Sequence, residues 1–147
     1  MNTKETIKNH LEFLGYEVMD NIEDSIICRR NGYSGILIRW TESYISLFGK
    51  YNINELAKNN TADFLSYINR LNCQSSISTF YLDEDNEFCF ASIYTGSYDK
   101  KLFAEYLEQW ENDTCHRLDR IQETDRFLGT LDSLSQSTYE TNISACA

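Results

Sequence analysis

Apolar residues recur along the chain in two patterns: every three to four residues, as in a helix, and every second residue, as in a strand. Near the N-terminus Ile7, Leu11 and Leu14 follow helical spacing until Gly15, which is a natural C-terminal stop. The same period returns twice. The helices predicted in this way cover Thr3–Leu14, about Thr61–Asn72, and a last one from Ser97 or Asp99 to Gln122 or Leu128.

Between these helices lie short runs rich in β-branched and aromatic residues. Asn31-Gly32 is a strong hairpin signal, and the acidic stretch Asp83–Glu87 is typical of a second tight connection. A turn is expected around Asn54–Asn59. The predicted strands are Ser25–Arg30, Gly35–Thr41, Ser43–Tyr51, about Ser76–Asp83 and about Glu87–Gly96.

The resulting order is α-β-β-β-α-β-β-α, which predicts an α+β fold with one five-stranded antiparallel sheet. A parallel sheet would require strands and helices to alternate, and they do not. Each helix has a single apolar stripe, so we expect the helices to cover one face or the edges of the sheet. Residues 1–128 are predicted to form one domain. Residues 129–147 are rich in Ser and Thr, and we expect a tail that is mobile or ordered by a partner.

Several predicted strands are apolar on both faces. Ile36, Ile38 and Trp40 alternate with Leu37, and a similar double pattern occupies the run from Phe88 to Tyr94. A sheet that helices cover on one side should alternate apolar and polar residues. The second face therefore needs a cover, which could be the last helix, the C-terminal tail, a second copy or another protein.

Three segments resemble the YbjN family and the wider group with the type III secretion chaperone-like fold. His10–Val18 (HLEFLGYEV) is similar to the opening helix of the family and its exit into the first strand. Tyr67–Asn72 (YINRLN) resembles the end of the family's next helix, and Phe80–Phe88 (FYLDEDNEF) resembles the hairpin that follows. The similarity extends in order over about Ile7–Arg117.

The resemblance implies a non-catalytic protein that binds other proteins, as a chaperone or as a regulator. Members of the chaperone branch are small, acidic and often homodimeric, and they hold an extended effector segment on an apolar surface. We accordingly expect a protein partner and a symmetric homodimer. Aromatic and large aliphatic strand residues are the expected anchors of these contacts: Ile38, Trp40, Tyr44, Phe90 and Tyr94.

The charge of the chain narrows the choice of partners. Thirteen Lys and Arg stand against 23 Asp and Glu, a net charge of −10. Such a surface repels phosphate backbones and anionic lipid, so neither direct nucleic-acid binding nor membrane binding is expected. An alternative function is a small acidic inhibitor or immunity-type protein that blocks a basic, nucleic-acid-binding site of its target. The polar start and the five unpatterned cysteines favour a cytoplasmic location.

Signals of catalysis are weak. The six glycines are scattered and form no phosphate-binding loop, and no nucleophile–base pairing stands out. The acidic turn would need glycine at Phe88 and glutamate at Tyr94 to be a calcium loop. We therefore predict no enzymatic activity, no metal and no cofactor.

Overall fold

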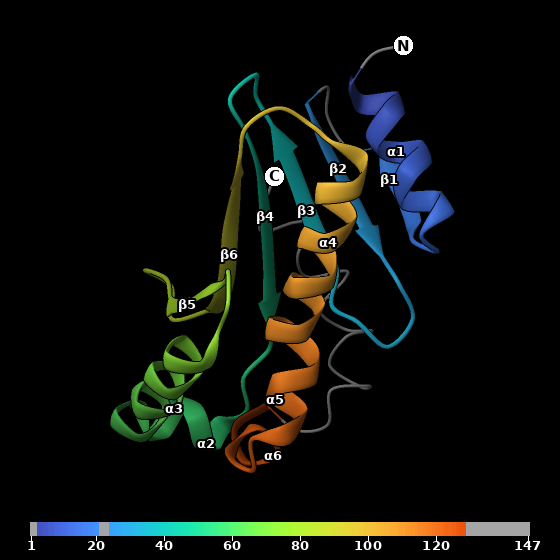
Figure 1. Ribbon diagram of the computed structural model, residues 1–147. Helices are drawn as coiled ribbons and strands as arrows, with labels where there is room; N and C mark the ends of the chain where they lie inside the picture. Colours follow the sequence, from blue (N-terminus) through green and yellow to red (C-terminus); the bar gives the residue numbers. More distant parts are fainter. Residues whose placement is uncertain (1–2, 21–23, 129–147) are drawn as a thin grey trace.

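Six antiparallel strands form one sheet in the computed structural model, which describes residues 3–20 and 24–128 (Figure 1). The strand order across the sheet is β1-β2-β3-β4-β6-β5. The two longest strands, β4 and β6, pair with each other inside the sheet, and the two shortest, β1 and β5, lie at its edges. Their bounds are β1 Glu17–Asp20, β2 Ser25–Arg29, β3 Ile36–Trp40, β4 Tyr44–Tyr51, β5 Thr79–Leu82 and β6 Phe88–Thr95.

The sheet has six strands rather than the five that were predicted, and the missed strand is β1. It pairs with β2 from Glu17 opposite Arg29 to Asp20 opposite Ile26. Four residues are too few to display a clear period of two, which is why the pattern did not predict this strand. The two predicted hairpins are confirmed as β2–β3 and β5–β6, and Gly32 in the first has φ +87°.

The predicted helices are present, with one addition in the connection after β4. The expected turn around Asn54–Asn59 contains a short helix, α2, because the Asn54 side chain accepts a hydrogen bond from the backbone N–H of Ala57 at 3.0 Å. The first three helices are α1 Thr3–Phe13, α2 Glu55–Asn59 and α3 Thr61–Gln74.

The long last helix predicted from the sequence is divided into four parts. The α-helix α4, Lys100–Glu111, continues into a π-helical turn at Asn112–His116 and then into α5, Arg117–Arg120. Ile121 has extended backbone angles (φ −95°, ψ 118°), which end the helix before α6, Glu123–Leu128. Leu118 and Ile121 keep the helical period in the sequence, so the break is not visible in the apolar pattern.

All the described helices pack on one face of the sheet, as expected. Figure 1 shows α4 running along the sheet in front of β3 and β4, with α1 over β1 and β2. Side chains from every helix join the same cluster of buried residues, among them Leu11 of α1, Phe64 of α3, Trp110 of α4 and Phe127 of α6. The opposite face of the sheet, called the open face below, carries no helix among the described residues.

Candidate protein-binding surface

The five contact residues predicted from the sequence do not share a surface. Ile38 and Phe90 are fully buried in the core under the helices, and Trp40 is also buried there. Tyr94 is half-buried against the rings of Phe103 and Tyr106. Only Tyr44, near one end of β4, is well exposed. Ile38, Trp40 and Phe90 are buried because the strand face with the larger side chains is the one that the helices cover. A partner contact through these residues stays a prediction.

The open face instead carries an apolar row that crosses five of the six strands. Residues in register across neighbouring strands form this row, which we call the open-face stripe: Met19, Ile27, Leu37, Phe48 and Ala91. Leu37 and Ala91 were recognised in the sequence as the alternate apolar set of their strands. Ile27 and Phe48 were missed, although each also stands at the alternate position of its strand.

A shallow groove of about 410 Å³ runs along the stripe between β3, β4 and β6. Leu37, Phe48, Ala91 and Ile93 supply its apolar lining, and Arg39 and Ser46 supply polar groups. Ile93 projects most, with 62% of its surface exposed. An exposed large aliphatic residue beside an apolar groove is a typical feature of a protein contact.

Charged side chains flank the stripe. Arg29 lies 3.3 Å from Glu17 on one side, and the nearly buried Lys50 pairs with Glu87. On the other side Arg39 is exposed between Ser25 and Ser46 in the register. The residues named here carry three positive and two negative charges.

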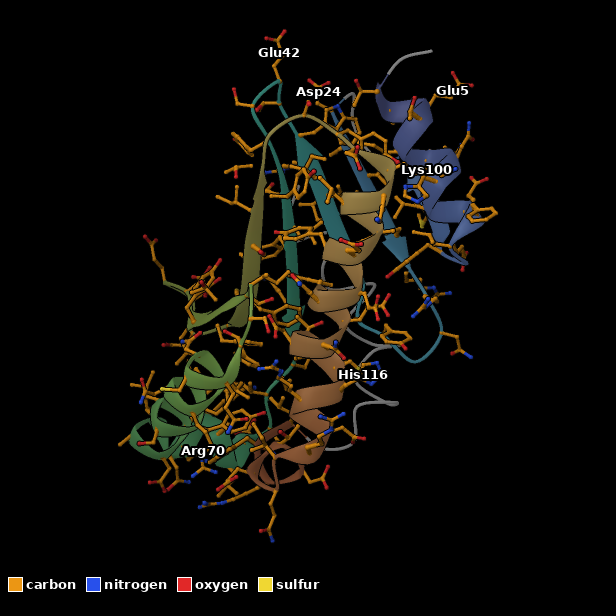
Figure 2. All side chains as sticks on the ribbon, viewed as in Figure 1. Glu5, Asp24, Glu42, Arg70, Lys100 and His116 are labelled. Atoms are coloured by element: carbon orange, nitrogen blue, oxygen red, sulfur yellow. The ribbon has the colours of Figure 1, made fainter. Side chains whose placement is uncertain are left out.

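A polar cleft of about 560 Å³ lies on the opposite side of the molecule, along α4. Glu111 is its centre: it accepts a hydrogen bond from the Tyr16 hydroxyl and lies 2.5 Å from the Arg30 guanidinium. Arg30 also stacks over the Tyr33 ring at 4.4 Å. His116, which Figure 2 shows on the helix-covered side, contacts Tyr33 with ring centroids 5.6 Å apart. These contacts hold the β2–β3 connection against α4.

Burial raises the pKa of Glu111, an effect that Tyr16, Arg30 and His116 oppose and Glu108 supports. A carboxyl whose folded pKa is raised contributes most to stability below its ordinary pKa and loses this contribution as pH rises through the folded value. We expect wild-type stability to fall relative to Glu111→Gln across that interval. Urea unfolding at a series of pH values measures it, with Glu105→Gln, at an exposed position of α4, as control. A difference that is constant with pH would contradict the prediction.

No group of three or more His, Cys, Asp and Glu side chains suited to a metal ion occurs in the described part of the chain. His10 is buried beside Tyr98, and burial lowers its pKa. Cys28, Cys73, Cys89 and Cys115 form no disulfide bond. The absence of enzymatic activity, metal and cofactor stays a prediction.

Within residues 3–20 and 24–128, no helix has the length and apolar content that crossing a bilayer requires. The predicted cytoplasmic location is not tested by this finding.

Comparison with known proteins places the fold in a recognisable class. The sequence matches no model of a known protein family. It also matches no curated protein. Three chains among the solved structures are similar in fold.

One of these chains is YbjN from E. coli, described as a candidate transcription regulator. The two structures superpose with a TM-score of 0.60 and 15% sequence identity, over 76% of this chain and 85% of YbjN. The chain therefore has a YbjN-like fold, which confirms that part of the resemblance seen in the sequence. The similarity to type III secretion chaperones stays a prediction.

Proposed function

We propose that this chain is a non-catalytic protein-binding module, regulatory or chaperone-like, that holds an apolar segment of a partner on its open face. The observation that carries the proposal is the open-face stripe with its groove, which the described helices leave uncovered. The YbjN-like fold supports a regulatory role, because YbjN itself is described as a candidate regulator.

The alternative, an acidic protein that blocks a basic site, has less support at this surface. The charged side chains beside the open-face stripe include two ion pairs, Arg29 with Glu17 and Lys50 with Glu87. The two functions differ in their response to salt, since screening weakens a charge-driven complex and leaves an apolar contact largely intact.

The homodimer predicted from the sequence stays a prediction. Ile38 and Phe90 cannot mediate it in the folded protein because both side chains are fully buried. A symmetric contact through a face of the sheet would use the open face, since the described helices cover the other face.

We expect Ile93→Glu to abolish capture of the specific partner, because it places a charge beside the groove at a position that is 62% exposed and tolerates substitution. The matched control is Leu65→Glu on α3, which is 47% exposed and belongs to the helix side of the molecule. Affinity capture from the source cell with quantitative mass spectrometry compares the two variants with wild type.

Partners that bind wild type and Leu65→Glu, but not Ile93→Glu, support the proposal when their capture also survives high salt. Equal capture by all three proteins contradicts it. Capture that high salt abolishes, whatever residue stands at 93, supports the acidic inhibitor instead.

A further inference from the structure

The strand β5 lies at one edge of the sheet and, among the described strands, pairs with β6 alone (Figure 1). Its register with β6 and the hydrogen bond from the Asp83 N–H to the Glu87 carbonyl fix the direction of its backbone groups. Hydrogen-bonded and non-hydrogen-bonded pairs alternate along antiparallel strands, so Thr79 and Tyr81 bond to β6. The N–H and C=O groups of Phe80 therefore point outwards, where another strand could bind them.

Asn72, in the last turn of α3, occupies both of these groups. Its side-chain Oδ1 accepts a hydrogen bond from the Phe80 N–H at 2.7 Å, and its Nδ2 donates one to the Phe80 carbonyl at 2.9 Å. A primary amide presents an acceptor and a donor side by side, as the backbone of a neighbouring strand does. The Asn72 side chain thus takes the place of a strand beside Phe80.

Two further side chains bind the residue that precedes β5. The Ser78 carbonyl accepts a hydrogen bond from the Ser75 hydroxyl at 2.6 Å, and the Ser78 N–H donates one to the Asp113 carboxylate at 3.0 Å. Ser75 follows α3 directly, and Asp113 belongs to the π-helical turn. Side chains from two parts of the helix layer therefore occupy the backbone groups of Ser78 and Phe80.

The sequence of β5 has none of the usual features that prevent pairing at a sheet edge. It reads Thr-Phe-Tyr-Leu, with no charged residue and no proline, and three of its four residue types are enriched in strands. Such an edge pairs readily with the same edge of a second copy when its outward backbone groups are free. Hydrogen bonds from neighbouring side chains replace the missing protection.

We propose that Asn72 keeps the β5 edge closed, and that without its side chain β5 becomes an association surface for β5 of a second copy. The inference gives a role to the last residue of the YINRLN segment. It is independent of the proposed function, because it concerns the edge of the sheet and not the open face.

Hydrogen–deuterium exchange followed by NMR at low protein concentration tests the closed edge. We expect the Phe80 N–H to exchange about tenfold faster in Asn72→Ala than in wild type, because its acceptor is lost. The matched control is Asn69→Ala, at an exposed position of α3 one turn earlier, which should leave this exchange unchanged. Equal exchange of the Phe80 N–H in Asn72→Ala and wild type would overturn the inference.

Sedimentation velocity over a range of protein concentrations tests the association surface. In salt that screens the net charge of −10, Asn72→Ala should reach about twice the mass of the wild-type particle, and Asn69→Ala should match wild type. The Phe80 N–H of the associated protein should again exchange slowly, since the second strand binds it. Association without this renewed protection, or no association, would contradict the proposal.

Asn72→Asp separates the closed edge from a general loss of structure. Its carboxylate keeps an acceptor for the Phe80 N–H and adds a charge at the edge, so we expect slow exchange and no association. Association as strong as that of Asn72→Ala would show that the β5 edge is not the surface that pairs. Should Asn72→Ala fail to fold, Asn72→Ser, whose side chain is too short to bond both groups, replaces it with the same expected results.

Discussion

Asp113→Ala should lower the free energy of unfolding by about 3 kcal/mol, because it leaves three backbone N–H groups without their acceptor. The Asp113 carboxylate is fully buried in the π-helical turn. It accepts hydrogen bonds from the backbone N–H groups of Ser76, Ile77 and Ser78 at 2.9, 2.9 and 3.0 Å. One side chain thus fixes the connection between α3 and β5 to the end of α4.

Chemical unfolding followed by tryptophan fluorescence measures this loss. Asp113→Asn should have an intermediate effect, since the amide keeps one acceptor oxygen and turns an N–H group towards the remaining donors. Asp119→Ala, at an exposed position of α5, is the matched control and should stay within about 0.5 kcal/mol of wild type. An Asp113→Ala protein as stable as the control would show that water replaces the carboxylate at little cost.

The sequence predicted most elements of the fold because their apolar residues keep a clear period. Segments without a period were missed. β1 is four residues long, and its place in the sheet depends on pairing with β2 rather than on its own pattern. The π-helical turn at Asn112–His116 also leaves no mark in the apolar spacing. It depends on tertiary contacts such as the 2.6 Å hydrogen bond from the Tyr51 hydroxyl to the Thr114 carbonyl.

Ile38 and Phe90, which were predicted as contacts, lie on the face of the sheet that the helices cover, whereas the binding surface proposed above is the open face. Two sets of apolar residues alternate along the strands, and periodicity alone does not say which set faces the helices. The contact residues were chosen as the largest apolar side chains of the strands. This choice selected Ile38 and Phe90, which belong to the hydrophobic core between the sheet and the helices. The set with smaller side chains, which includes Leu37 and Ala91, lies on the open face, against which no helix among the described residues packs.

Phe90→Ala should be as damaging as any single substitution in this chain, with a loss of about 3 to 5 kcal/mol in the free energy of unfolding. The Phe90 ring is fully buried, with ring centroids 4.9 Å from Tyr51, 5.5 Å from Trp110 and 5.7 Å from Phe80. Gly49 lies opposite Phe90 on β4, and only glycine fits there, because a Cβ at this position would lie 2.5 Å from Phe90 Cε2. Removal of the ring leaves a cavity that these rigid neighbours cannot fill.

Ile93→Ala provides the matched comparison, three residues further along β6 and on the open face. Its side chain is 62% exposed, so we expect a change in stability within about 0.5 kcal/mol and a clear loss of partner binding. Thermal or urea unfolding and partner capture, measured on both variants, separate the two roles. Should Phe90→Ala remain stable and lose the partner while Ile93→Ala keeps it, the aromatic face of the sheet would be the binding surface and α4 would have to move away from it. The expected opposite result assigns the large aromatic residues of β6 to the core and places recognition on the open face.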